Sequence, residues 1–210
     1  MHISDAHDAE NVANSEKQEN VLAIIKRRRS IGKMTPQIPT RHQIERLLEA
    51  AVYAPNHHNI EPWHFFVIAG QARHELGHIM ERSLAAQLTE TVSEQAQAAL
   101  KKERHKPLRA PVIIAAVSRY PQLPQVMEIE NIEATAAAVQ NMLLAAEEMG
   151  LACTWRTKSP AYDMQVKRWL GIAPEDHIVA LLDVGFSALP HRPHAPRSFV
   201  EKTTWLDWYE

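Results

Sequence analysis

The segment NIEATAAAVQNMLLAAEEM, residues 131–149, decides how the rest of the chain can be arranged. It is rich in alanine and apolar on more than one face, which is typical of a helix packed inside a domain. Gly150 follows it directly, at the position where many helices end in a left-handed residue. The sequence therefore predicts a central helix with the other elements packed around it.

Four short apolar runs predict strands beside this helix, at residues 63–69, 111–118, 151–156 and 178–186. Apolar spacing and caps predict further helices at about residues 16–30, 41–53, 71–102 and 162–170. Helices and strands are interspersed without strict alternation, and no internal repeat is present. This order favours an α+β or mixed-sheet layered domain over a doubly wound parallel one.

Composition excludes several classes of protein. The chain has 210 residues, of which 45% are hydrophobic and 23% charged, which excludes collagen-like, mucin-like and wholly disordered chains. The net charge of −2 provides no global positive field for nucleic acid. Cys153 is the one cysteine, so a disulfide framework or a four-cysteine metal site is excluded. The six glycines are too far apart for a Rossmann fingerprint or a P-loop.

The sequence also makes predictions about location and domain limits. Neither a leader sequence nor a membrane-length apolar run is visible, so we expect a cytoplasmic protein that uses no membrane. Residues 1–18 predict a flexible tail, and residues 19–210 a single domain. The aromatic end of the chain, residues 203–209, predicts an arm that packs on its own core or on a second subunit.

One literal motif points to a different chemistry. Residues 74–78 read His-Glu-Leu-Gly-His, which on a helix places His74 and His78 on one face, with Glu75 as the general base of a zinc hydrolase. The extended form of the motif fails, because Glu81 and Leu84 stand where its glycine and third histidine would be. We expect a solvated helix face here, with a zinc site as the alternative.

Three other features together indicate a planar ligand that carries an anion. The first is the basic turn, residues 27–33, with three arginines, Ser30 and Lys33; alone, it would be typical of helix-dipole compensation. The second is the polar loop, residues 55–62, which is bracketed by prolines just before a buried strand; alone, it could be a surface turn. The third is residues 154–158, where a core strand ends in Trp155, Arg156 and Thr157. Cys153, inside that strand, is expected to be a core residue.

The order and spacing of several short motifs make the chain resemble the FMN-dependent nitroreductase family. They cover about residues 20–205: IxxRRS at 25–30, LLxAAxxAPNxxN at 47–59, xPWHFFVI at 61–68, ExxGLxCxWR at 147–156 and DVGF at 183–186. The resemblance implies an intertwined homodimer with a mostly antiparallel sheet flanked by helices. It implies FMN at the subunit interface, NADH or NADPH as the electron donor and a small molecule as the acceptor.

The resemblance also assigns roles to residues. The FMN phosphate and ribityl chain would be bound by Arg28, Arg29 and Ser30, and by Arg197 with Arg192 behind it. The polar loop of the partner subunit would contact the flavin, as would residues at the end of the 151–156 strand. The loop residues are Tyr53, Pro55, Asn56, His57 and Asn59, and those of the strand end are Trp155, Arg156 and Thr157.

The chain departs from the family two residues after Ser30. Many members have a basic residue there, near the flavin pyrimidine, whereas this chain has Gly32 followed by Lys33. Three cations are therefore candidates for stabilising the reduced flavin: Arg29, Lys33 and Arg156.

Function follows from the resemblance as an expectation. Flavin N5 would carry the chemistry, with no catalytic side chain. Hydride would pass by a ping-pong mechanism from NAD(P)H to nitroaromatics, quinones or similar acceptors. A flavin protein of another redox role is the alternative, because a fold does not determine a function.

Overall fold

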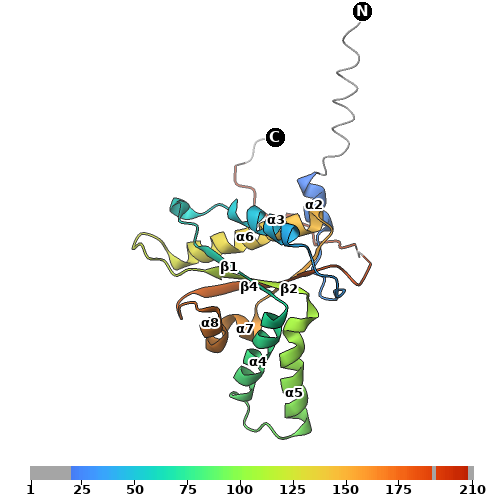
Figure 1. Ribbon diagram of the computed structural model, residues 1–210. Coiled ribbons are helices and arrows are strands. Elements are labelled where there is room, and N and C mark those ends of the chain that lie inside the picture. Colours follow the sequence, from blue (N-terminus) through green and yellow to red (C-terminus); the bar gives the residue numbers. More distant parts are fainter. Residues whose placement is uncertain (1–19, 191–192, 208–210) are drawn as a thin grey trace, which may run out of the picture.

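The structure is a computed structural model that describes residues 20–190 and 193–207. The predicted tail at residues 1–18, Arg192 and the last residues of the aromatic end lie outside the described residues. A four-stranded antiparallel sheet in the order β1-β2-β4-β3 forms its centre (Figure 1). The strands are β1 (Trp63–Ala69), β2 (Val112–Ser118), β3 (Ala152–Arg156) and β4 (His177–Gly185).

Helices cover both faces of the sheet (Figure 1). One face carries α2 (Val21–Arg27), α3 (Arg41–Val52) and α6 (Glu128–Glu148). The other carries α4 (Gln71–Ala85), α7 (Lys158–Tyr162) and α8 (Met164–Leu170), with α5 (Glu94–His105) packed beside α4. Short 3-10 turns complete the chain: η1 (His57–Asn59), η2 (Lys106–Arg109) and η3 (Val200–Lys202).

The core divides into two apolar clusters, one on each face of the sheet. Side chains alternate along each strand, so Ile114 and Leu182 pack toward α6, while Ile113 and Leu181 pack toward α4 and α8. Met142 of α6 is fully buried at the centre of the first cluster. The prediction of a central helix is confirmed.

The prediction of a mostly antiparallel sheet is also confirmed. Ser30 forms a parallel bridge with Cys153, so the basic turn lies along the outer edge of β3. All of the main strand pairs are antiparallel. Gly150 has a left-handed φ of +70° and ends α6, because the N–H of Leu151 bonds back to the carbonyl of Ala146 at 2.8 Å.

Three helix predictions were wrong in their limits. The predicted helix at 16–30 begins at Val21, because the Asn20 side chain accepts a 2.9 Å bond from the N–H of Leu22 and caps it. The predicted helix at 71–102 is two helices, with Ser93 capping the second one. The helix at 162–170 is preceded by α7, and Asp163 caps α8 by accepting from the N–H of Gln165 at 2.7 Å.

Within the described residues, no helix has both the length and the apolar character needed to cross a bilayer.

Candidate functional site

The basic turn lies beside β3. The sequence predicts that the basic turn and the end of this strand bind one ligand together, and this position allows it. α2 ends at Arg27, and Arg28 turns into an extended conformation with φ −50° and ψ 133°. The N–H of Ile31 then donates to the carbonyl of Cys153 at 2.9 Å. This bond brings the segment with Arg28, Arg29 and Ser30 alongside the strand that ends in Trp155 and Arg156.

A small polar cradle lies where the two segments meet. A Cβ placed on Gly32 would lie 3.3 Å from Arg156 Nη2 and 3.7 Å from Thr154 Oγ1. The Thr154 hydroxyl is buried, and none of the described residues offers it a hydrogen bond. A ligand in this cradle would meet a buried hydroxyl and a guanidinium.

Arg156 is held by a buried carboxylate. Its Nε donates to Oδ2 of Asp183, which lies on β4 and is only 3% exposed. Burial raises the pKa of the Asp183 carboxyl, and the hydrogen bond and charge of Arg156 oppose that rise. Asp183 is the one charged residue in its predicted strand, and that signal could have identified it as an ion-pair partner.

A cavity of about 100 Å³ opens beside this ion pair, between α4 and β4. Leu76 and Met80 form part of its apolar wall. Four cations line it: Lys106, Arg109, Arg156 and Lys158. The charge of Arg109 acts on Asp183, whereas Lys106 bonds to Glu103. Sequence reasoning missed these cavity residues other than Arg156, because they come from elements far apart in the chain.

The remaining residues at the end of β3 differ in what they offer a ligand. Trp155 donates its indole N–H to the carbonyl of Val179 at 3.0 Å and packs against the core on the α6 face. Thr157 is exposed and precedes Lys158, which has a left-handed φ of +52°. Arg156, Thr157 and Lys158 therefore line the cavity, whereas the Trp155 ring packs against the core.

Arg29 and the C-terminal segment, residues 187–207, meet near the end of α2. Arg29 Nη1 donates to the carbonyl oxygens of Lys26 and Arg28 at 2.8 and 2.5 Å, and Nη2 to that of His194 at 3.5 Å. Arg197 lies in the same exposed segment. The contact with His194 therefore brings the segment that contains Arg197 toward the basic turn.

The polar loop has its own organised geometry. Asn56 Oδ1 accepts from the N–H of Glu61 at 2.9 Å and closes the loop. His58, Asn59 and Glu61 all have left-handed φ values, of 55°, 51° and 48°. Such conformations are uncommon outside glycine and often mark functional sites. Pro55 and His57 are exposed, as is Tyr53, at 81%.

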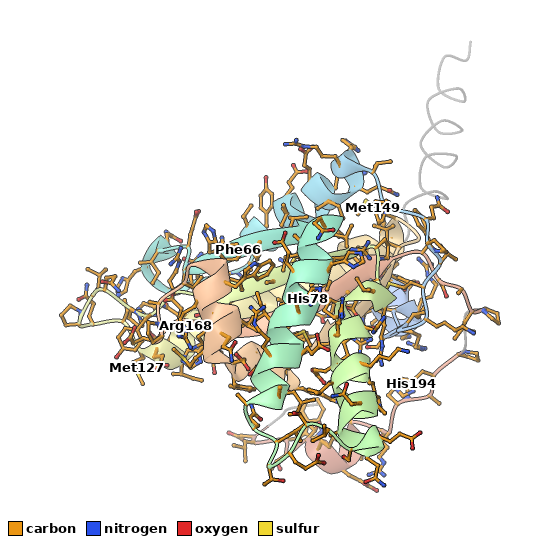
Figure 2. All side chains as sticks on the ribbon, turned by 60° about the horizontal axis from the view of Figure 1, so that its bottom comes forward. Phe66, His78, Met127, Met149, Arg168 and His194 are labelled. Carbon is orange, nitrogen blue, oxygen red and sulfur yellow. The ribbon has the colours of Figure 1, made fainter. Side chains whose placement is uncertain are left out.

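The polar loop and the basic turn lie at opposite ends of α6. His57 Nδ1 lies 3.7 Å from Glu130 Oε1, while Arg27 Nε donates to Glu147 Oε1 at 2.8 Å. The two glutamates are 17 residues apart on one helix, or about 25 Å at 1.5 Å per residue. Figure 2 shows Met127 and Met149, the residues that flank α6, on opposite sides of the molecule. One chain therefore does not bring the two groups together.

Exposed apolar side chains gather around these groups. None of the described side chains of α2 is buried, and Val21, Leu22 and Ile25 are exposed. Large apolar side chains are also exposed beside the polar loop and in the C-terminal segment: Val52, Tyr53, Phe199, Val200, Trp205 and Leu206. Apolar surface of this extent is typical of an interface.

The zinc alternative finds no support in the geometry. His74 and Glu75 are exposed on α4. His78, labelled in Figure 2, places its Nε2 3.1 Å from the guanidinium of Arg104 on α5, where that charge would repel a metal ion. Among the described residues, no cluster of three or more His, Cys, Asp or Glu could hold a metal.

Comparisons with known proteins agree with this geometry. The family model described as "Nitroreductase family" matches residues 25–186. The Escherichia coli K12 protein "Putative NAD(P)H nitroreductase YdjA" is 30% identical over 166 residues, covering 79% of this chain and 87% of that protein.

Solved structures extend the similarity to the fold. The nitroreductase-like family protein from Bacillus cereus is 25% identical, with a TM-score of 0.79 over 91% of this chain and 98% of that one. A protein described as a "putative nitroreductase in complex with fmn" from Desulfovibrio desulfuricans is 25% identical, with a TM-score of 0.68 over 92% of this chain and 100% of that one. The family model covers most of the sheet and its helices, so the chain belongs to the nitroreductase family.

Proposed function

We propose that the protein is an FMN-dependent NAD(P)H oxidoreductase that acts as a homodimer. The observation that carries this proposal is the position of the polar loop and the basic turn at opposite ends of α6. A two-fold axis perpendicular to α6 would pair the two copies of that helix antiparallel, so it would set the loop of one chain against the basic turn of the other. Two equivalent composite sites result, each incomplete in one chain.

The exposed apolar surface supports the same assembly. In the dimer, α2 and the aromatic C-terminal segment are covered by the partner, which removes their apolar side chains from water. Burying a side chain of this size stabilises an interface by about 1.5–3 kcal/mol before the costs of association. The surface therefore supplies a driving force for association at the place where the composite site needs it.

The residues present fit FMN. Arg28, Arg29 and Ser30 offer guanidinium and hydroxyl donors to a phosphate, and Arg197 is brought near by the Arg29–His194 contact. The cradle at Gly32, with the unpartnered Thr154 hydroxyl and Arg156, offers donors to the rest of the group. Thr157 and the backbone after it complete this half. The partner's half is the polar loop, with Tyr53, Pro55, Asn56, His57 and Asn59.

FMN would supply hydride and electron transfer between NAD(P)H and an acceptor. The chain's own residues would hold the cofactor, and we propose that both reactants use one shared site on it. They would then bind in turn, which predicts ping-pong kinetics. As acceptors we propose small electron-poor compounds such as nitroaromatics and quinones. Dependence on NAD(P)H supports a location in the cytoplasm.

A spectrum tests the cofactor and the donor directly. The purified protein, reconstituted with FMN, is expected to show flavin absorption bands that bleach when NADPH or NADH is added without oxygen. A protein that cannot be reconstituted with FMN would overturn the proposal. Flavin that is bound but not bleached by either nucleotide would favour the other redox role.

Subunit complementation tests the composite site. A turn variant, Arg28→Ala with Ser30→Ala, and a loop variant, His57→Ala with Asn59→Ala, are each expected to lose most FMN binding. A heterodimer of the two contains one intact site, so it is expected to bind one FMN per dimer. Two variants that fail to complement, although the heterodimer forms, would show that the two groups act within one chain.

A further inference from the structure

We infer that Arg156 is the cation that stabilises the negative charge gained by FMN on reduction. Asp183 holds its guanidinium in place, and Gly32 leaves the space that the guanidinium occupies. This inference rests on the proposed function. It chooses among the three cations that the sequence leaves open, Arg29, Lys33 and Arg156, and it assigns a positioning role to Asp183.

The guanidinium of Arg156 is held in place by Asp183. Thr154 and Asp183 are direct partners in the β3–β4 register, so Asp183 lies on the same face of the sheet as Thr154 and Arg156. The buried carboxylate of Asp183 accepts a hydrogen bond from Nε of Arg156, and the rest of the guanidinium extends toward the basic turn. A cation that is already oriented needs little reorganisation when a new charge appears beside it.

Gly32 makes the approach of this guanidinium possible. The Arg156 Nη2 atom lies 3.3 Å from the place of a Cβ on Gly32, so an alanine there would displace the guanidinium by a few tenths of an ångström and a branched residue would displace it farther. Gly32 does not have a left-handed φ, so its missing side chain provides space and not backbone freedom. The guanidinium thus lies against the segment that follows Ser30, which is the segment proposed to hold FMN.

The other two cations are less suited. The Arg29 guanidinium bonds to carbonyl oxygens at the end of α2 and in the C-terminal segment, which suits a role at the phosphate. Lys33 is exposed, whereas Arg156 is partly buried and held by Asp183, so solvent screens the charge of Lys33 more.

The Asp183 carboxylate does not cancel the effect of Arg156. It lies behind the guanidinium, on β4, and the nearer charge dominates because Coulomb energy falls with distance. Arg109 also acts on Asp183, and Lys106 and Lys158 line the same cavity, so the group as a whole is positive. Of these three, only Lys106 forms an ion pair with a carboxylate of the described residues, that of Glu103.

The test is the flavin reduction potential of Arg156→Gln, measured with the FMN-loaded dimer. The variant is expected to lower the affinity for reduced FMN relative to oxidised FMN about tenfold, which is about 30 mV for a two-electron couple. The matched control is Arg119→Gln, which removes an ion pair to another buried carboxylate, Asp176, at the far end of β2. It is expected to cost similar stability and leave the potential unchanged.

Two further variants address Gly32. Gly32→Val, whose branches need more room than a Cβ alone, is expected to lower the potential when Arg156 is present and to have no effect in Arg156→Gln, which gives a measurable coupling between the two positions. Gly32→Lys in the Arg156→Gln background returns a cation to the same place and is expected to restore the potential. Asp183→Asn weakens the anchor of Arg156 and also removes a negative charge, which by itself would raise the potential. We therefore expect a smaller fall in potential than in Arg156→Gln, and any fall would report the loss of the anchor.

The outcomes separate the inference from the proposed function. A wild-type protein that binds no FMN overturns the proposed function. A wild-type protein that is reduced by NAD(P)H, with Arg156→Gln at the wild-type potential, overturns only the inference. If Arg156→Gln does not fold, Gly32→Val decides, because it keeps both members of the Arg156–Asp183 pair and displaces only the guanidinium: an unchanged potential in that variant overturns the inference as well.

Discussion

The N–H of Ile31 donates a 2.9 Å hydrogen bond to the carbonyl of Cys153, and this bond joins the basic turn to the edge of the sheet. Ile31 follows Ser30, which bridges the same residue in the parallel sense. The basic turn and the end of β3, which are more than 120 residues apart in the chain, are therefore held in a fixed position relative to each other. We expect FMN binding at the proposed composite site to depend on this register.

Ile31→Pro tests that dependence. Proline removes the N–H, and it favours an extended conformation in the residue before it, which Ser30 as a bridge residue already has. Losing the bond without a change in charge is expected to weaken FMN binding about fivefold, since a hydrogen bond contributes about 1 kcal/mol. Ile31→Val keeps the N–H and is the control. Equal FMN affinities for the two variants, by fluorescence titration, would contradict the role of this bond.

Leu22→Lys tests the interface. Leu22 lies on α2 and is 52% exposed in the single chain, so a lysine there costs the monomer little. In the proposed dimer it would place a charge in an apolar contact, and we expect monomers with little FMN. Val92→Lys is the matched control, because Val92 is 87% exposed on the turn between α4 and α5. Sedimentation velocity measures both variants, and a dimeric Leu22→Lys would exclude α2 from the interface.

Asp183 makes a pH-dependent contribution to stability. Burial raises its folded pKa above the unfolded value, so the folded state binds the proton more tightly than the unfolded state does. Its contribution is therefore fully present below about pH 4, the unfolded pKa, and falls as pH rises toward the folded pKa. Relative to Asp183→Asn, the FMN-free wild-type protein is expected to lose stability over that window. Thermal unfolding of both from pH 4 upward measures the difference, and a difference that grows in favour of the wild type would contradict it.

Cys153 is expected to be inert in the folded protein. Burial raises the pKa of its thiol to about 12, so almost no thiolate is present at pH 8. A thiol reagent such as dithionitrobenzoate should react only after denaturant is added, with one thiol per chain. Rapid reaction in native buffer would show that the edge of β3 opens, which would also break the bond from Ile31.

The sequence predicted the elements whose pattern is local. The alternating and apolar runs of β1, β2, β3 and β4 were found within a residue or two of each end, because period and turn residues lie inside each segment. α7 was missed, since Thr157, Lys158, Ser159 and Pro160 do not form a helical pattern of their own. The break between α4 and α5 was missed for a similar reason, because the Glu90 carboxylate that holds the turn is an ordinary surface residue by sequence.

The candidate site was only half visible from sequence. Motif order identified the basic turn, the polar loop and the end of β3, but the pairing of Arg156 with Asp183 depends on strand register between residues 27 positions apart. The role of Gly32 as space for a guanidinium likewise appears only when β3 lies beside it. Long-range register is set by the whole sheet, and no window of sequence contains it.

The separation of the polar loop and the basic turn along α6 makes assembly of the proposed dimer depend on the concentration of FMN. In the proposed dimer, every FMN bridges two chains, so dissociation of one dimer destroys two sites at once. By mass action, the cofactor then acts as an assembly signal: scarce FMN favours separate chains with their apolar α2 surface bare, and abundant FMN favours the closed pair. The concentration of active enzyme would rise more steeply than in proportion to the vitamin-derived cofactor available.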